Sequence, residues 1–384
     1  MAFQIIRADI TKVKADAIVN SANPEPIYGR GVDSAIYHAA GVEALLKERE
    51  KIGALATGEV AVTPAFALPA KYIIHTVGPV WSGGSSGELL ALEACYKNAL
   101  KKAEALYCES IAFPMISTGV YGFPKDRALQ TALRTIRDHL DETDSEMEIS
   151  LVVYDRGSFQ ISPALRSDVA AYLNHQTNSF PEMARYNYSA MPGAAVPPEK
   201  KGNRRGRNVG RARRRRELLK EPEPSYYRPE PRETVRDDEW DQQESLETSR
   251  DEALSLTGAL PVESLQERVA HVGDTFQQCL LRWIDEKELK DVDVYKKANL
   301  DRKLFSKIRC NVNYVPKKQT AFALAIALEL TLDETKDLLR RAGLAFSPSN
   351  VFDLIIEYCI ENKLYDIFEI NALLFDYDQP TLGC

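Results

Sequence analysis

Residues 17–33 read AIVNSANPEPIYGRGVD and set the architecture of the first half of the chain. A short β-branched strand leads into a loop that contains Asn, Pro and Gly, and a helix begins after that loop. The same alternation of strand and helix continues on both sides. The predicted strands are Phe3–Arg7, Ala17–Asn20, Val60–Thr63, Tyr72–Thr76, Ser110–Pro114 and Ile149–Tyr154, and the last four are apolar enough for burial on both faces.

Helical patterns fill the intervals between these strands. Apolar residues recur at three- and four-residue spacing in Glu88–Leu106 and Lys125–Asp141, and Ser162 with Pro163 has the N-cap and first-turn residues of a further helix. Strands that alternate with helices are typical of an α/β domain. We therefore predict a mixed, mostly parallel sheet with helices on both faces over residues 1–176.

Two glycine-containing loops lead from predicted strands into predicted helices. The first is Tyr28–Asp33, and the second is Ser117–Gly122, between the strand that ends at Pro114 and the helix that begins near Lys125. Unpaired N–H groups at a helix N-terminus attract anions, so two such loops suit two linked phosphates. No Gly-Lys-Ser/Thr follows either loop and no GxGxxG follows the first strand, which indicates a diphosphate site of another kind.

These segments resemble the macro domain, a family that binds ADP-ribose. Five of them occur in the order and spacing of that family and cover residues 4–160, namely ADIT, DAIVNSAN, GRGVDSAIYHAAG, TGEVAVTPAFALPAKYIIHTVGPVW and SIAFPMISTGVYGFP. The arrangement is most similar to the hydrolytic, MacroD-type branch. The resemblance implies that ADP-ribose, or a macromolecule modified with it, is the partner of this domain.

The resemblance also implies a role for each matching position. Asp9 and the Ile10 backbone would hold the adenine amino group, and Tyr154 would lie against the adenine ring. The two phosphate loops would consist of Gly29, Gly31 and Val32, and of Ser117, Thr118, Gly119, Val120 and Tyr121. Asn20, Asn23 and Asp33 would surround the distal ribose, where the scissile bond lies.

Each of these residues also has a purely structural interpretation. Asp9 fits a turn, Asn20 and Asn23 fit the end of a strand, and Asp33 fits the first turn of a helix, where the helix dipole favours an acid. Tyr154 fits core packing at a strand end. The five-segment match, rather than any single residue, favours the functional interpretation.

Asn23 and Asp33 are ten residues apart, as in the hydrolytic branch, in which an Asn and an Asp position the ribose and the attacking water. A carboxylate there would stabilise an oxocarbenium-like state and help to deprotonate the water. Two positions depart from that branch. Tyr37 replaces the usual His and is no base near pH 7, and Arg30, expected to point into solvent, interrupts the usual run of glycines.

Three functions are therefore open. The leading one is hydrolysis of ADP-ribose from a modified macromolecule, or of O-acetyl-ADP-ribose, with Asn23, Asp33 and Tyr37 as catalytic residues. The second is a non-catalytic ADP-ribose reader, which Tyr37 and Arg30 favour. The third is a DNA-binding regulator that responds to ADP-ribose.

The composition limits the other classes of protein to which the chain could belong. No window approaches 18 consecutive apolar residues, so no membrane span is predicted, and the longest apolar run, Ala321–Leu328, fits a core helix. The N-terminus lacks the pattern of a signal peptide. Six scattered cysteines without CxxC pairs predict reduced thiols in the cytoplasm, with no structural metal, and no cofactor is expected.

The net charge of −7 conceals two opposed blocks. Residues 200–216 carry ten Lys/Arg and no acid, whereas residues 221–252 carry twelve Asp/Glu against four Arg. With few aliphatic residues and several prolines, residues 177–260 are predicted to be a disordered linker. The basic block is a candidate arm for nucleic acid or poly(ADP-ribose); alternatively, its cations pair with the acidic block.

Residues 262–384 show an all-helical pattern of about six short helices. Thr331 to Glu334 has the spacing of a capping box, the helix that follows is expected to end at Gly343, and Ser347 with Pro348 is predicted to start the next one. This region is predicted to be a separate domain.

Two helical patterns in this region, Val294–Asn299 and Arg302–Arg309, loosely resemble the helix-turn-helix of phage-repressor-type proteins. In the turn, Asn299 would adopt the left-handed conformation, Leu300 would be buried and Asp301 would cap the second helix. If the region binds DNA, the side chains that face the major groove would be Arg302, Lys303, Ser306, Lys307 and Arg309. The alternative is a protein-interaction module with the same fold.

Overall fold

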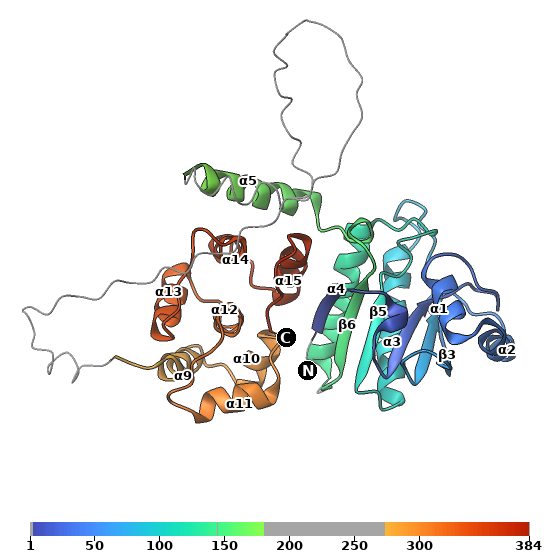
Figure 1. Ribbon diagram of the computed structural model, residues 1–384, viewed down its shortest axis with the longest axis horizontal. Coiled ribbons are helices and arrows are strands. Elements are labelled where there is room, and N and C mark those ends of the chain that lie inside the picture. The colour runs from blue at the N-terminus through green and yellow to red at the C-terminus, as the bar shows by residue number, and fades with distance from the viewer. Residues whose placement is uncertain (1–2, 144, 180–272, 384) are drawn as a thin grey trace, which may run out of the picture. The chain divides into compact units, whose positions relative to one another are not determined.

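The computed structural model of the chain describes residues 3–143, 145–179 and 273–383 (Figure 1). Most of the predicted linker lies outside these ranges, with its basic block 200–216, and so do residues 262–272 at the start of the predicted helical domain. Residues 3–179 and 274–383 belong to one compact unit, made of an α/β region and a helical region.

A six-stranded sheet forms the centre of the α/β region, in the order β1-β6-β5-β2-β4-β3. The pairing of β3 with β4 is antiparallel, and the other pairings described are parallel, which confirms the predicted mixed sheet. The strands are β1 (Phe3–Arg7), β2 (Ala17–Ser21), β3 (Val60–Pro64), β4 (Tyr72–Thr76), β5 (Ser110–Pro114) and β6 (Glu148–Val153).

Helices cover both faces of this sheet (Figure 1). On one face lie α1 (Val32–Ala40) and α2 (Val42–Ile52), and on the other lie α3 (Glu88–Ala105) and α4 (Lys125–Glu142). Because successive side chains of a strand point to opposite faces, Ile18 of β2 belongs to the core beneath α1 and α2, and Val19 belongs to the core beneath α3 and α4.

The burial of the last four strands departs from the prediction at one place. β4, β5 and β6 are buried over almost their whole length, as predicted, but the prediction is wrong for β3, where Val60, Ala61 and Val62 remain partly exposed. β3 is an edge strand, and an edge strand has a neighbour on one side only.

The last helix of the α/β region, α5 (Pro163–Ser179), begins at the predicted Ser162–Pro163 signal. It extends past residue 176, where the sequence predicts the end of the domain. The boundary predicted there therefore falls within a helix.

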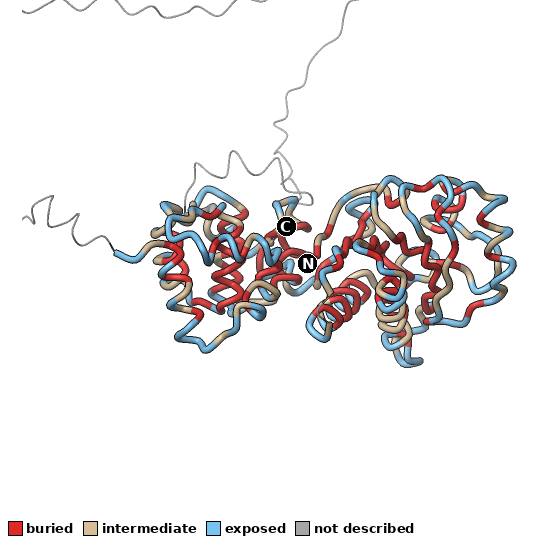
Figure 2. Tube along the Cα trace, turned by 90° about the horizontal axis from the view of Figure 1, so that it is seen from below, coloured by how far each residue is buried: buried red, intermediate tan, exposed pale blue. Residues whose placement is uncertain are grey.

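The helical region contains seven described helices, where the sequence predicts about six: α9 (Phe276–Glu286), α10 (Asp291–Lys297), α11 (Arg302–Cys310), α12 (Lys318–Ala327), α13 (Leu332–Arg341), α14 (Val351–Glu361) and α15 (Ile367–Asp376). Every residue from Thr320 to Leu328 is buried. This confirms that the apolar run Ala321–Leu328 belongs to a core helix, α12. Figure 2 shows buried stretches of this kind in both regions. No helix in the described part of the chain has the length and apolarity needed to cross a bilayer.

The ends of these helices follow the local signals with two exceptions. The capping box at Thr331 and Glu334 is confirmed. By contrast, α14 begins at Val351 with Asn350 as its cap, and not at Pro348, because the Asp353 carboxylate accepts the Ser347 N–H at 2.6 Å and holds a turn before the helix. The predicted pattern Val294–Asn299 is shifted, since α10 runs from Asp291 to Lys297.

Candidate functional site

A cleft opens at the carboxyl ends of the parallel strands β1, β2, β5 and β6. It has two lobes with volumes of about 480 and 370 Å³. The lobes share Gly31, Val32, Met115 and Gly119, so the two glycine-containing loops meet where the lobes join. The carboxyl ends of parallel strands are the usual ligand site of an α/β sheet.

The larger lobe lies between the ends of β1 and β6, and Asp9, Ile10, Thr118 and Tyr154 line it. The Asp9 carboxylate accepts hydrogen bonds from the Thr11 N–H at 3.0 Å and the Thr11 hydroxyl at 2.7 Å, which lower the pKa of Asp9. Asp9 thus caps a turn and remains an anion at the lobe. Tyr154 is 72% exposed, so core packing is the wrong interpretation of this residue and its ring is accessible.

The smaller lobe contains Asn23, Asp33 and Tyr121. The buried Asp33 carboxylate accepts hydrogen bonds from Asn20 Nδ2 at 2.6 Å, from the Gly29 N–H at 2.6 Å and from Asn23 Nδ2 at 3.3 Å. Burial raises the pKa of Asp33, although these hydrogen bonds oppose the rise. The carboxylate is therefore held in one orientation and is a stronger base than an exposed aspartate.

The two loops have the backbone geometry of an anion site. A Cβ on Gly29 would lie 2.7 Å from Asn23 Nδ2, and Gly31, with a φ of 70°, precedes the first turn of α1. In the second loop, Ser117 has a φ of 63°, and its buried Oγ has no hydrogen-bond partner among the described residues. Arg30 borders the smaller lobe and is exposed, in agreement with its expected orientation.

Asn20 lies behind the cleft and does not line it. Its Nδ2 group joins Asp33 to His75, whose Nδ1 atom is 3.2 Å away, and the opposite ring nitrogen of His75 is 2.9 Å from the Thr63 hydroxyl. All four side chains are buried. Burial lowers the pKa of His75 to about 3, so this ring is neutral near pH 7.

Tyr37 also lies behind the cleft. It is 2% exposed, and its ring packs on Tyr28 with the ring centroids 5.3 Å apart. Burial and the neighbouring Asp33 raise the pKa of Tyr37 to about 12. Tyr37 therefore stays protonated near neutral pH, as expected from the sequence.

Arg49 and His75 support the site although the sequence did not predict them. Arg49 is 1% exposed and donates to the carbonyls of Asn23 and Pro24 at 3.4 and 3.3 Å, which holds the first loop against α2. Nothing in the local sequence distinguishes Arg49 from neighbouring cations of α2. His75 did carry a signal, because it is a polar residue within an apolar strand, YIIHT.

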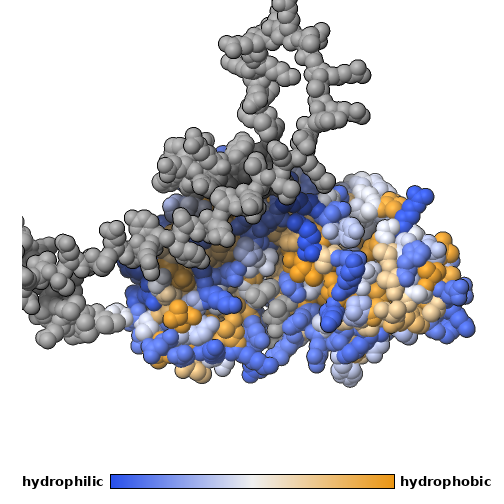
Figure 3. Space-filling view, in the orientation of Figure 1, coloured by the Kyte–Doolittle hydropathy of each residue, from blue (hydrophilic) through white to orange (hydrophobic). Residues whose placement is uncertain are grey.

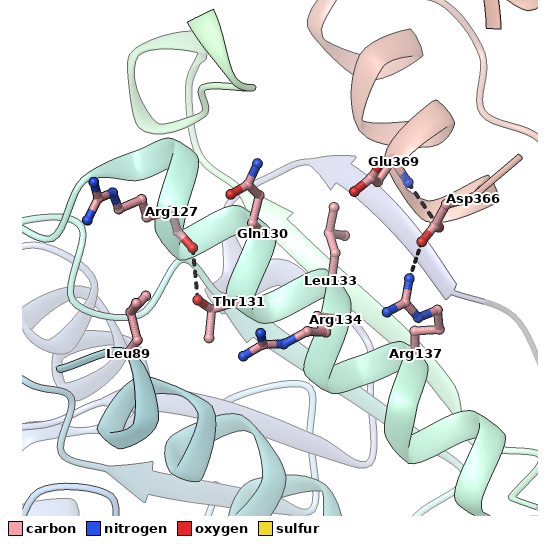
Figure 4. Close-up of a pocket in the computed structure, with 9 residues that line it drawn as sticks. All are labelled: Leu89, Arg127, Gln130, Thr131, Leu133, Arg134, Arg137, Asp366 and Glu369. Carbon is pink, nitrogen blue, oxygen red and sulfur yellow. Dashed lines mark hydrogen bonds and ion pairs between the residues drawn. The ribbon is translucent and has the colours of Figure 1, made fainter. Parts of the chain in front are cut away.

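A further cavity of about 490 Å³ lies between α4 and α15 (Figure 4). Arg137 reaches from α4 to the Asp366 carboxylate at the start of α15, and Arg134 pairs with Glu93 at 3.0 Å. Two of its arginines are therefore neutralised by partners within the chain.

The turn between α10 and α11 has the local geometry that the sequence predicts. Asn299 has a φ of 52°, Leu300 is buried and the Asp301 carboxylate accepts the Lys303 N–H at 2.7 Å. Arg309 is paired with Asp291 at 2.5 Å. The five residues predicted to contact DNA are all exposed on α11: Arg302, Lys303, Ser306, Lys307 and Arg309. Figure 3 shows that the lower border of this face of the molecule is largely hydrophilic.

Comparison with known proteins identifies relatives of the α/β region. Residues 19–132 match the family model described as Macro domain. A macro domain-containing protein of Chlorobaculum tepidum is 48% identical over 152 residues, which cover 39% of this chain and 88% of that protein. A Salmonella typhimurium protein named O-acetyl-ADP-ribose deacetylase is 46% identical over 155 residues, 40% of this chain and 87% of that protein. The solved Trypanosoma brucei macrodomain in complex with ADP-ribose is 35% identical, with a TM-score of 0.38 over 41% of this chain and 66% of that chain.

Proposed function

The chain belongs to the macro-domain family, and from this premise we propose that its α/β region binds ADP-ribose and hydrolyses ADP-ribose derivatives. The observation that carries the proposal is the two-lobed cleft, with Asn23 and Asp33 in one lobe and Asp9 and Tyr154 in the other. The deacetylase name of the Salmonella typhimurium relative supports the catalytic part.

In the proposed complex, ADP-ribose extends across both lobes. The adenine occupies the larger lobe, with its amino group at Asp9 and Ile10 and its ring at Tyr154. The diphosphate lies where the lobes join, between Gly31 with Val32 and the second loop. Backbone N–H groups at the start of α1 and the unpaired Ser117 hydroxyl would bind its oxygens. The smaller lobe, with Gly29, Val120 and Tyr121, receives the distal ribose.

The proposed chemistry uses one water molecule and the Asn23–Asp33 pair. The water attacks the anomeric carbon of the distal ribose, the bond from that carbon to the attached group breaks, and the group leaves with the bonding electrons. Asp33 accepts the proton from the water and stabilises the positive charge that develops on the sugar. Asn23 orients the ribose. Tyr37 stays protonated and lies behind Asp33, outside the cleft. In O-acetyl-ADP-ribose the same water would attack the acetyl carbonyl carbon, and the ester C–O bond would break to release acetate and ADP-ribose, with the proton of the water passed to the ribose oxygen.

Single-turnover release of ADP-ribose tests this proposal. Wild type, Asn23→Ala and Asp33→Ala would be assayed on Asp/Glu-linked and nucleic-acid-linked ADP-ribose and on O-acetyl-ADP-ribose, with ADP-ribose binding measured by calorimetry. Glu50→Ala, an exposed carboxylate of α2 outside the cleft, is the matched control. We expect release to fall by roughly 100-fold or more in Asn23→Ala and Asp33→Ala while binding persists, and to be unchanged in Glu50→Ala.

Tight binding without release from any substrate would instead identify a non-catalytic reader. The exposed Arg30 and the protonated Tyr37 are the features that favour this second function. Failure of the wild type to bind ADP-ribose would contradict both.

The exposed basic face of α11 supports a further candidate function, contact with nucleic acid. Arg302, Lys303 and Lys307 are exposed on one short helix, with the Lys307 ammonium 5.9 Å from the centroid of the Tyr314 ring, whereas Arg309 is paired with Asp291. Such contact would make the chain an ADP-ribose-responsive regulator. Salt-dependent binding of duplex DNA by the full chain tests this function.

A further inference from the structure

The segment after α15 contacts β1 and the turn that follows β6, both of which lead to the larger lobe of the cleft. Asp378, which follows α15, accepts from Arg7 Nη1 at 2.7 Å with one carboxylate oxygen and pairs with Arg156 through the other. Arg7 is the last residue of β1 and lies two positions before Asp9. Arg156 follows β6 and lies two positions after Tyr154. One carboxylate therefore bridges the two segments that carry the proposed adenine contacts.

Aromatic packing holds this bridge in place. The Arg7 guanidinium lies over the ring of Phe375 in α15, 5.0 Å from its centroid, and the same ring packs edge-on against Phe159 at 4.8 Å. Phe159 and Phe375 are both buried. The end of α15 therefore packs against both segments. The contact consists of buried aromatic rings as well as ion pairs.

The other end of β1 is fixed by the same region. The Asn299 side chain accepts the Phe3 N–H and donates to the Phe3 carbonyl, both at 2.8 Å, so it pairs with the open edge of β1 as a neighbouring strand would. The ring of Phe368 in α15 packs on Phe3 at 4.7 Å. β1 cannot slide along the sheet while these contacts are present, and the position of Asp9 follows from that of β1.

Tyr154 depends on the bridge in a different way. Its ring is 72% exposed and is not held by a core. Its backbone leads into a 3-10 helix, Arg156–Ser158, that is capped by the Asp155 side chain. Arg156 is the side chain of that turn that pairs with the helical region. The spacing between the Tyr154 ring and Asp9 is thus set in part from outside the α/β region.

We propose that Asp378 is a positioning residue for the adenine end of the cleft, through which the helical region sets the selectivity of the macro domain for the adenine base. This inference rests on the proposed function, since it takes Asp9 and Tyr154 as the adenine contacts. Asp378 acts through Arg7 and Arg156 and touches no ligand. By thermodynamic linkage, a ligand in the larger lobe also strengthens the contact between the two regions.

The test compares two ligands that differ only in the base. Binding of ADP-ribose and of inosine diphosphate ribose, in which hypoxanthine replaces adenine, would be measured on the full chain. The variants are Asp378→Asn, Asp378→Lys and Arg156→Gln. Glu329→Gln is the control, because Glu329 pairs with Lys297 within the helical region. Thermal denaturation followed by circular dichroism would establish that each variant is folded.

We expect Asp378→Asn and Arg156→Gln to weaken ADP-ribose binding about threefold and Asp378→Lys about tenfold, since the pairs are partly exposed and screened. Binding of the inosine analogue should change little, so the preference for adenine falls by the same factors. A variant that only destabilises the fold would weaken the binding of both ligands by the same factor. In 1 M salt the difference between wild type and Asp378→Asn should shrink.

The outcomes separate this inference from the proposed function. If wild type binds ADP-ribose and all three folded variants keep its affinity and base preference, Asp378 is no positioning residue and the inference is wrong. If wild type binds neither ligand, the proposed function fails and the inference fails with it.

Discussion

Asp33 combines burial with a dense set of hydrogen-bond donors. Burial raises the pKa of Asp33 above its ordinary value of 3.8, while Asn20, Gly29 and Asn23 stabilise the anion. The proposed base must be ionised, so release of ADP-ribose should fall as the pH drops through this raised pKa. The pKa of Tyr37, raised to about 12, lies far from this range.

We therefore expect an acid limb with a slope of one proton in the single-turnover rate measured between pH 4 and pH 10, with its midpoint above pH 3.8. Tyr37→Phe should leave the midpoint in place, because Tyr37 does not titrate there. A rate independent of pH would show that Asp33 is not the base, and a midpoint that moves in Tyr37→Phe would show that Tyr37 contributes to the titration.

His75 links the same network to the stability of the domain. Burial lowers the pKa of His75 from 6.5 to about 3. At a pH between these two pKa values, the unfolded state therefore binds a proton that the folded state does not. The stability contributed by the neutral ring is present above pH 6.5 and is lost as the pH falls toward 3. Asn20 Nδ2 can donate to Nδ1, which places the ring proton on Nε2, facing Thr63.

Urea denaturation of wild type and His75→Gln at several pH values between 7.5 and 4.5 measures this contribution. Below pH 6.5 the free energy of unfolding of wild type should fall faster than that of His75→Gln, by up to about 1.4 kcal/mol per pH unit. His75→Gln should be the less stable protein at pH 7.5. Parallel curves for the two proteins would mean that His75 is protonated in the folded state.

The turn between α10 and α11 contributes one side chain to the sheet. Asn299 satisfies both the N–H and the carbonyl of Phe3, and its φ of 52° is a conformation that Gly adopts freely. Asn299→Gly therefore removes the amide without straining the backbone. We expect it to lower the free energy of unfolding by roughly 1–3 kcal/mol, because the Phe3 N–H and the Phe3 carbonyl each lose a buried hydrogen bond.

Lys363→Gly is the matched control for Asn299→Gly. Lys363 has a φ of 56° in the turn after α14 and is exposed. Its replacement should change the free energy of unfolding by no more than about 0.5 kcal/mol, as measured by urea denaturation. If Asn299→Gly costs no more than Lys363→Gly, the edge of β1 does not depend on the helical region.

Local patterns were enough to predict most elements of the fold. The strands were predicted to within about one residue because each is a short β-branched run between polar residues, and α13 was predicted by its capping box. The starts of α10 and α14 were not predicted correctly, because such starts depend on contacts like the hydrogen bond from the Ser347 N–H to Asp353. The exposure of β3 depends on the strand order, which periodicity does not determine.

The candidate site was predictable for the same reason, up to a limit. Its lining comes from loops at the carboxyl ends of strands, and those loops carry recognisable Asn, Asp and Gly residues. The supporting residues Arg49 and Asp378 were missed because their role depends on contacts with distant parts of the chain. The sequence predicted that Asn20 and Tyr37 belong to the site, but not that both are buried behind the residues that line the cleft.

The distribution of basic residues over the whole molecule suits a polyanionic partner. Two separate basic features stand out: the exposed face of α11, and residues 200–216, which lie outside the described ranges. Phosphate contacts by lysine and arginine release counterions, so affinity falls with salt by about 0.9 logarithmic units per contact for each logarithmic unit of salt concentration. The salt slope therefore counts contacts, and it can be divided between the two features.

We expect the full chain to bind duplex DNA at low salt, and we expect Lys303→Ala with Lys307→Ala to reduce the salt slope by about two contacts. The control pair is Lys287→Ala with Lys363→Ala, two exposed lysines of the helical region away from α11. Fluorescence anisotropy at a series of salt concentrations measures the slope. Equal slopes for both pairs would assign the DNA contact to residues outside α11, and no binding at low salt would exclude a nucleic-acid partner and with it the regulator function.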